Sequence, residues 1–415
     1  MIYIESWCFM RLTKTSIILA VVIVLLVFQS VLEIIWGGFS YIDESVIVIA
    51  CILIFVRRGI CNRTCADKKF IMVLFHMCIF LGCGSTACIV YKYQKMPLVL
   101  QDLIANVKFY FAIVTGFLLL RRVDWDKTAL YINKIAITIS YIIFCIFIVD
   151  RFLYPFGGQY RYGIRSAVLL YPHSTYLAGA MAFLLVCIAA TYCRKDKVPV
   201  ILDAIVMMMT LRSKAIVATV IFLFLLWNIL IRNKKLKVWQ IVLIVIGSII
   251  IAWSQISYYF VELSGRSARS ILLSTSIRIM KDYFPLGTGF GTFASHSAAV
   301  NYSPVYIKYG FSSIYEVSNL NENAFLDDTF WPIIIGQTGF IGTIAYIYIL
   351  FAMMKKILRL KHKNKKIYVA SLYIMLYLFI SSMAEPAFNN SIAVPLGVML
   401  GLFFRVSCES EQSMI

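Results

Sequence analysis

The apolar run QIVLIVIGSIIIAWS at residues 240–254 and the apolar run TFWPIIIGQTGFIGTIAYIYIL at residues 329–350 enclose a long, largely polar stretch at residues 257–328. Each run is long enough to form a helix that crosses much or all of a bilayer, because about 20 predominantly apolar residues span its hydrocarbon core. The sequence therefore predicts a large loop on one membrane surface, held between two hydrophobic helices.

Apolar runs recur along the whole chain, which is 61% hydrophobic and only 14% charged. Such a composition leaves too little polar surface to cover a soluble protein. The runs predict about twelve transmembrane helices, because a helix satisfies its own backbone groups in lipid. They lie at residues 15–38, 46–56, 70–90, 103–120, 128–149, 172–192, 198–211, 214–231, 238–256, 329–354, 367–384 and 391–404. The predicted fold is a single all-α polytopic membrane domain, residues 1–415, with the large loop between helices nine and ten.

Lysine and arginine residues indicate the orientation of the chain. They gather at every second junction, namely at residues 57–69, 121–122, 194–197, 232–237 and 355–366. Because basic residues in short loops stay on the cytoplasmic side, we expect these junctions and both termini to be cytoplasmic and the large loop to be external. The net charge of +19 is mostly this topological signal, with some attraction to anionic lipid of the bilayer, and nucleic acid is not an expected partner.

The eleven cysteines lie in the predicted helices or on the cytoplasmic side, so they are expected to be reduced thiols. Cys61 and Cys65 are spaced as zinc ligands are, but no second Cys or His pair lies nearby. The sequence therefore indicates no metal site, and we expect no cofactor.

The seventh apolar run, residues 198–211, is unusually short. Its roughly 14 residues make a helix of about 21 Å, against about 30 Å of hydrocarbon. Arg212 and Lys214 should then lie below the outer surface, where cations are costly unless an anion meets them. These two side chains could reach up to lipid headgroups, or they could form a phosphate site, which is the interpretation we favour.

External arginines are the second indication of a phosphate ligand, because the guanidinium group presents a planar fork of donors to phosphate oxygens. Some of them could instead pair with Asp150, Glu262 or Asp282. The candidates for binding a diphosphate are Arg165, Arg212, Arg266 and Arg278 with Lys214, and the other external arginines are Arg151, Arg161 and Arg269.

Carboxylates gather late in the large loop, at Glu322, Asp327 and Asp328. Next to a helix start they could cap its positive end, or one of them could orient or deprotonate a substrate hydroxyl. His173 and His296 are possible acids or bases, although a lone histidine is more often a polar residue with a structural partner.

Glycines recur in the run Gly287-Thr-Gly-Phe-Gly291, which superficially resembles a nucleotide-binding fingerprint. The run lacks the strand before it and the helix after it that such a fingerprint needs, so it predicts a tight turn.

Several separated motifs together resemble the Wzy-type polysaccharide polymerases and the related O-antigen ligases. The motifs are Arg165 to His173, Thr210-Leu-Arg-Ser-Lys214, Pro285-Leu-Gly-Thr-Gly-Phe-Gly-Thr-Phe293, and Asp327-Asp-Thr-Phe-Trp-Pro leading to Gly342. This resemblance implies an enzyme of the bacterial cytoplasmic membrane that transfers a growing glycan from undecaprenyl diphosphate to a lipid-linked acceptor. It also implies a flippase and a chain-length regulator as partners, and no nucleotide sugar.

The resemblance assigns roles to particular residues. Arg165, Arg212 and Arg278 would bind the leaving diphosphate, and Asp328, with Asp327 or Glu322 as substitutes, would orient the acceptor. Ligases typically carry a His-Asn pair where this chain has Asp328-Thr329, which favours a polymerase, and Gln337 stands where an acidic residue is common. A ligase remains an alternative. A flippase or other transporter, the second alternative, predicts charges near the bilayer midplane and two related halves.

Overall fold

The computed structural model describes residues 14–58, 68–119, 125–234, 239–240, 243, 246–247, 257, 267–321 and 324–412. Helices form nearly all of the regular structure, and the only strands in these ranges are β1 (Tyr160–Arg161) and β2 (Ile164–Arg165), a short antiparallel hairpin. The predicted all-α class is confirmed. The predicted ninth span lies mostly outside the described residues.

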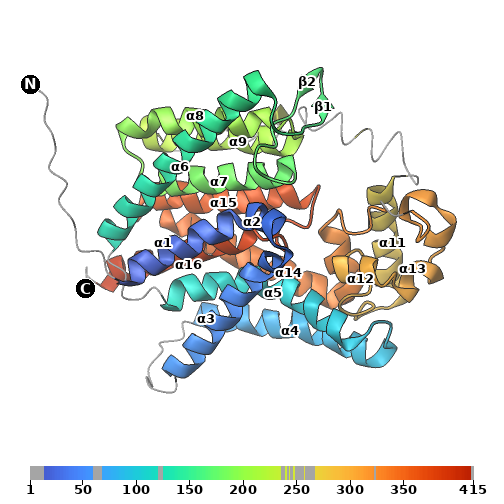
Figure 1. The fold of residues 1–415 in the computed structure, drawn as a ribbon. Helices are drawn as coiled ribbons and strands as arrows, with labels where there is room; N and C mark the ends of the chain where they lie inside the picture. The colour runs from blue at the N-terminus through green and yellow to red at the C-terminus, as the bar shows by residue number, and fades with distance from the viewer. Residues whose placement is uncertain are drawn as a thin grey trace, which may run out of the picture.

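The helical body contains segments from both halves of the chain (Figure 1). Its N-terminal elements are α1 (Lys14–Val27), α2 (Gln29–Ile35), η1 (Gly37–Tyr41) and α3 (Ile42–Arg58). Its central elements are α4 (Lys68–Tyr91), α5 (Met96–Leu119), α6 (Trp125–Leu153), α7 (Ser174–Thr191), η2 (Arg194–Asp196), α8 (Lys197–Met209), α9 (Ser213–Leu225) and the π-helical turn η3 (Leu226–Ile231). Its C-terminal elements are α14 (Trp331–Leu360), α15 (Lys365–Ser382) and α16 (Ala393–Gln412).

Six helices in the described part of the chain are long and apolar enough to cross a membrane: α4, α5, α6, α7, α9 with η3, and α14. The chain is therefore a membrane protein, but the predicted count of twelve spans is not confirmed. One reason is the first predicted span, which breaks at Phe28 into α1 and α2. Buried Gln29 follows this break and its Nε2 donates to Asp43 Oδ1 of α3 at 2.8 Å, which ties the two segments together.

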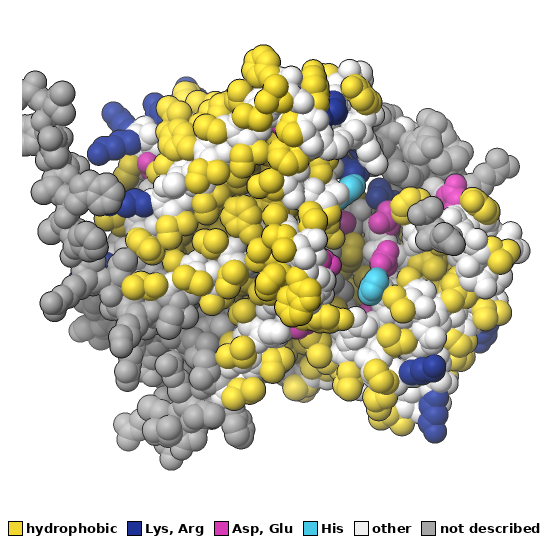
Figure 2. All heavy atoms as spheres, viewed as in Figure 1, with side chains coloured by type: hydrophobic (Ala, Val, Ile, Leu, Met, Phe, Trp, Pro, Cys, Tyr) yellow, Lys and Arg dark blue, Asp and Glu magenta, His cyan; other side chains and the backbone are white. Residues whose placement is uncertain are grey.

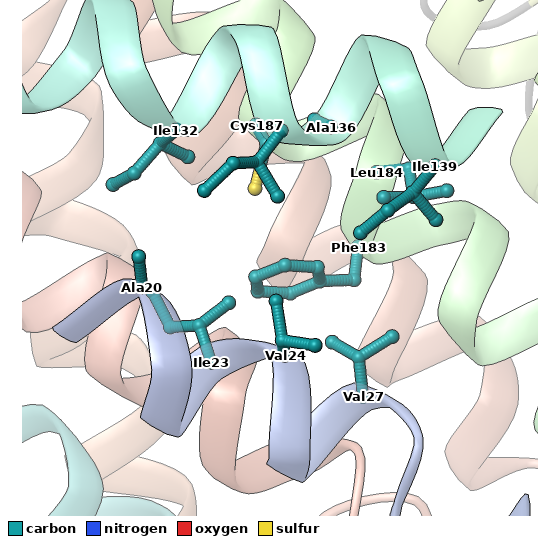
Figure 3. Close-up of a pocket in the computed structure, with 11 residues that line it drawn as sticks. Ala20, Ile23, Val24, Val27, Ile132, Ala136, Ile139, Phe183, Leu184 and Cys187 are labelled. Atoms are coloured by element: carbon teal, nitrogen blue, oxygen red, sulfur yellow. The ribbon is translucent and has the colours of Figure 1, made fainter. Parts of the chain in front are cut away.

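Helix α7 is the centre of the body, because 83% of it is buried inside the protein, the largest share among the six. It packs against α6 and α15, while α5 packs along α16 and α4 along α14. Where α1 meets α6 and α7, a gap of about 20 Å³ remains (Figure 3). Ile23, Ile132 and Phe183 are among its entirely apolar lining residues. A gap of that size holds at most about one water and offers no polar group to a ligand.

The large polar stretch folds into a lobe at one end of the helical body (Figure 1). Buried Leu272, Phe293, Tyr306 and Phe311 belong to a hydrophobic core of its own, separate from that of the body. What the sequence presents as a loop is therefore a packed helical unit over residues 267–321. Its elements are α11 (Ala268–Asp282), α12 (His296–Val300), α13 (Pro304–Lys308), η5 (Phe311–Ser313) and η6 (Tyr315–Val317).

The glycine run joins this lobe to α14. Gly289 N–H donates to Gln337 O at 2.9 Å, just before Gly339, whose φ of +61° interrupts the helix. Gly287 also has a positive φ, and a Cβ atom at this residue would lie 2.5 Å from Gly339 N. Only glycine allows the two backbones to approach so closely in these conformations.

Further along the run, Gly291 N–H donates to Asp102 Oδ2 of α5 at 2.8 Å. Asp102 is buried and also accepts from Asn106 Nδ2 at 3.1 Å. The run is thus the tight turn that the sequence indicates. Because the N–H groups of Gly289 and Gly291 already bond to protein acceptors, they are not open to a phosphate.

Candidate functional site

The short helix α8 places two cations beside the start of α7. It ends at Met209, as its short apolar run predicts, and Leu211 turns the chain with a φ of +54°. Arg212 then stands at the N-cap of α9, with Lys214 in the first turn of that helix. Both side chains are partly buried, and neither reaches freely into solvent.

Arg212 contacts the first residues of α7. Its Nε donates to Ser174 Oγ at 2.8 Å, and its Nη2 contacts His173 Nε2. His173 Nδ1 also accepts from the backbone N–H of Thr175, at 3.3 Å. A neutral imidazole has only one acceptor nitrogen, so these two donors compete for it. Arg212 can therefore turn an N–H donor towards a phosphate oxygen without leaving a buried acceptor unpaired.

The electrostatic surroundings hold His173 neutral. Burial lowers its pKa to about 4, and the nearby positive charges of Arg212, Lys214 and Arg161 act in the same direction. Protonating His173 would add a further cation to a cationic site, so the neutral form prevails at physiological pH.

We expect the ring nitrogens of His173 to stay in the neutral state from pH 8 down to about pH 5. Its pKa in the folded state lies below the ordinary value of 6.5, so protonation favours unfolding. The contribution of neutral His173 to the free energy of unfolding is complete above pH 6.5 and is lost as the pH falls towards 4. NMR of ¹⁵N-histidine-labelled protein, with the signal assigned by loss in His173→Gln, measures this titration. A midpoint near pH 6.5 would contradict the expected environment.

Lys214 pairs with Glu385, a carboxylate that follows the end of α15. The distance from Lys214 Nζ to Glu385 Oε2 is 2.6 Å, and each side chain is only 11% exposed. Sequence reasoning missed Glu385, although it is the one carboxylate between the predicted spans at residues 367–384 and 391–404. Its position as the only carboxylate of that segment is the feature by which the sequence could have indicated it.

Arg269, in the first turn of α11, links the lobe to the same place. Its Nη2 lies 3.4 Å from Asp328 Oδ2 and donates to Ala384 O at 3.2 Å. Ala384 directly precedes Glu385, so the cation from the lobe lies next to the Lys214–Glu385 pair. The sequence places Arg269 on the external side but does not single it out.

Asp327 points to a different partner from its neighbour Asp328. Its Oδ2 lies 3.2 Å from His296 Nδ1, and this hydrogen bond raises the pKa of His296, although burial opposes the shift. Neither aspartate caps α14, because that helix begins after Phe330 without a side-chain cap. Of the two interpretations open for Asp328, capping has no support from this geometry.

The charged cluster, as we name His173, Arg212, Lys214, Arg269, Asp328 and Glu385, behaves electrostatically as one unit. The pKa of Arg212 is lowered to about 10, mainly by burial and also by the charges of Arg161 and Arg269, while Glu385 and Asp328 oppose the shift. Arg212 remains a cation at neutral pH. Figure 2 shows basic, acidic and histidine side chains gathered in a hollow between the helical body and the lobe. Such an excess of cations at one place favours an anion with several oxygens.

Two of the predicted diphosphate ligands lie outside the charged cluster. Arg165 is held by Asp150, with its Nη2 2.8 Å from Oδ2 and 2.6 Å from the backbone oxygen, and it also contacts Phe156 O. Arg165 therefore stabilises the chain after α6 through these contacts. Arg278 is exposed, lies 5.4 Å from the ring centre of Tyr309, and stands near the far end of α11 from Arg269.

Five residues named in the sequence analysis lie outside the described residues. They are Arg266 and Glu322 of the candidate site, Glu262 as a possible partner of an arginine, and Cys61 and Cys65 of the weighed zinc site. Within the described ranges, no three His, Cys, Asp or Glu side chains gather so as to hold a metal ion.

Comparison with protein-family models and with curated proteins gives no match to this chain. The charged cluster and the motifs of the sequence are therefore the features that bear on its function. Chemically, the cluster offers guanidinium and ammonium donors to an anion, and two carboxylates next to them.

Proposed function

We propose that the chain is a glycosyltransferase of the bacterial cytoplasmic membrane that polymerises undecaprenyl-diphosphate-linked oligosaccharide units into a surface polysaccharide. The resemblance of its motifs to the Wzy-type polymerases supports this proposal, and so does the chemistry of the charged cluster. Donor and acceptor are both lipid-linked glycans, and a flippase and a chain-length regulator would be its partners. No nucleotide sugar takes part.

The observation that carries the proposal is the meeting of three cations from separate segments. Arg212 and Lys214 come from the turn before α9 and its first residues, and Arg269 comes from the lobe. Their carboxylate partners are Glu385 and Asp328. Lys214 begins an apolar span, so the cluster is near the end of a membrane helix, where the diphosphate of a lipid carrier would lie.

The reaction that follows from this arrangement is a displacement at the anomeric carbon of the donor. A hydroxyl oxygen of the acceptor sugar forms a bond to that carbon, and the bond from the carbon to the phosphate oxygen breaks. The electron pair leaves with the diphosphate, where Arg212, Lys214 and Arg269 stabilise the developing charge. The hydroxyl proton passes to the carboxylate of Asp328 and from there to water.

Revised roles follow for the predicted ligands. Arg212 keeps its predicted role, and Arg269 replaces Arg278 and Arg165 as the second guanidinium at the diphosphate. Asp328 keeps its role at the acceptor, because its side chain is 40% exposed and lies beside Arg269. Asp327 and His296 form a neighbouring pair, exposed enough to contact sugar hydroxyls.

The transporter alternative draws on a different part of the protein. Lys108 of α5 is buried and its Nζ lies 2.5 Å from Asp43 Oδ2, so charges do occur inside the helical body. Lys108 and Asp43 bond to each other, and Gln29 also donates to Asp43, as expected of a structural contact. This pair therefore gives no support to transport of the lipid-linked unit.

Purified protein in liposomes, supplied only with undecaprenyl-diphosphate-linked units, is expected to lengthen them. The bond between the donor sugar and the diphosphate supplies the free energy, so nucleotide sugar, added metal and a membrane potential are unnecessary. Gel separation of the glycans measures chain length, and empty liposomes are the control. If the units cross the bilayer and no dimer forms, the chain is a flippase. In a parallel reaction a separate glycolipid acceptor is added, and transfer of glycan to that acceptor alone would make the chain a ligase.

A further inference from the structure

An open pocket of about 640 Å³ lies at the end of the helical body opposite the charged cluster. Helices α7 and α15 establish this, because each begins or ends at the cluster and has its other end at the pocket. Each has 18 residues, which corresponds to a separation of about 27 Å. The pocket is too far from the cluster to be part of it, and the proposed polymerisation gives it no role.

Four lysines line this pocket, two in the turn between α14 and α15 and two at the start of α15, against one carboxylate, Asp126. Three of the amines reach structural acceptors: Lys363 Nζ donates to Ser407 O at 3.0 Å and Lys366 Nζ to Thr191 O at 3.3 Å, and Lys365 contacts Asn233. The fourth is Lys361, which is partly exposed. The lysines are thus held in place around the opening. Because one carboxylate faces four ammonium groups, the net charge at the opening is positive.

The other walls supply a polar atom and an apolar surface. Asn133 of α6 lines the pocket with only 8% of its surface exposed, and its Oδ1 is buried without a hydrogen-bond partner. Leu130, one turn away, is 43% exposed, and Trp125 stands beside it at the start of α6. A buried amide oxygen without a partner is costly, and a hydroxyl donor from a ligand would remove that cost.

We propose that this pocket binds a phosphate group carried by a molecule that also has hydroxyls. The lysines attract the phosphate, and Asn133 Oδ1 accepts a hydrogen bond from a hydroxyl of the ligand. Leu130 and Trp125 form an apolar wall. The headgroup of an anionic glycerophospholipid and a free phosphate share the chemistry that the lysines recognise. Occupancy would join the start of α6 and the end of α7 to the turn before α15.

Protection of the pocket lysines from acetylation tests the proposal without reference to activity. The full-length protein is placed in nanodiscs of phosphatidylcholine alone, of phosphatidylcholine with phosphatidylglycerol, or of phosphatidylcholine with inorganic phosphate in the buffer. Acetylation of Lys361 and Lys365 by a water-soluble reagent is followed by peptide mass spectrometry. We expect roughly tenfold slower acetylation at a ligand concentration about ten times its Kd, because about a tenth of the pockets then remain empty.

Lys195 and Lys355 are the internal controls, since both are exposed near the same end and neither lines the pocket. If only phosphatidylglycerol protects Lys361 and Lys365 more than these controls, the ligand is a lipid headgroup. If inorganic phosphate protects them, the ligand is free phosphate. Equal rates in all three conditions, or equal slowing of the control lysines, would overturn the proposal.

Asn133→Leu provides a matched variant that changes no charge and keeps the side-chain volume similar. We expect it to abolish most of the protection by phosphatidylglycerol, because the amide that accepts the headgroup hydroxyl is gone. Size-exclusion chromatography shows whether the variant is folded, and Lys361→Gln, a change at the partly exposed rim, serves if it is not. Undiminished protection in a folded variant would show that the lysines respond to the membrane surface alone.

Discussion

Replacing Arg212 with lysine is expected to lower the rate of polymer formation by about 10²- to 10³-fold, the effect of removing one well-placed donor to a developing anion. Lysine keeps the charge but cannot reproduce the two-pronged contact of a guanidinium with a diphosphate. It also lacks the Nε donor that reaches Ser174 Oγ at 2.8 Å, so the cation loses its fixed position. Elongation in liposomes, measured at equal amounts of folded protein, gives the ratio of rates.

Arg278→Lys is the matched control for this result. Arg278 belongs to the same lobe as Arg269, but it is exposed and stacks on Tyr309 away from the charged cluster. We expect its rate of elongation to stay within about threefold of wild type, because exposed side chains contribute little. Full activity of Arg212→Lys would mean that Arg212 only anchors the protein to headgroups, and equal losses in both variants would remove the distinction on which the site rests.

Composition and periodicity were sufficient to predict the fold class. A chain with so many apolar runs and basic junctions has few alternatives to a helical membrane protein, and the structure confirms this. The number of spans could not be counted in the same way. Polar Gln29 inside the first run bonds to Asp43 across a break, and a hydropathy pattern carries no information about such a partner.

The packed core of the lobe could not be predicted from the sequence for a related reason. Its stretch is polar on average, and its core depends on Leu272, Phe293 and Tyr306, which are scattered along the chain and meet only after folding. The glycines were more informative, because positive φ angles at Gly287 and Gly289 are a local property. The contact of Gly287 with Gly339 joins two distant segments, and neither glycine alone indicates it.

The candidate site shows the same division between local and distant information. The shortness of α8 is local, and α8 does end at Met209, just before Arg212 and Lys214. The partner of each charge is not local. Glu385 reaches Lys214 from the end of α15, while Arg165, which looked like a phosphate ligand, is occupied by Asp150. Residue types indicate what chemistry is possible, and folding decides which groups remain available.

Asp328 is the carboxylate on which the acceptor side of the proposed reaction depends. It lies 3.4 Å from Arg269 and its side chain is 40% exposed, so the hydroxyl of an acceptor sugar can approach it. Because α14 begins after Phe330 without a side-chain cap, a change at Asp328 should not act through the stability of that helix. Asp328→Asn therefore acts either on proton transfer or on the ion pair with Arg269, and binding of the donor distinguishes the two.

Asp328→Asn is expected to slow elongation by about 10²- to 10⁴-fold, the range in which general acid–base catalysis contributes. The amide keeps the shape and a hydrogen-bonding oxygen, but it cannot take the hydroxyl proton. Initial rates of elongation and the retention of radiolabelled donor separate chemistry from binding, and donor retention should be unchanged. Asp282→Asn is the control, since Asp282 accepts from Tyr309 Oη at the far end of α11 and should elongate normally. Normal elongation by Asp328→Asn would assign proton removal to the leaving diphosphate itself.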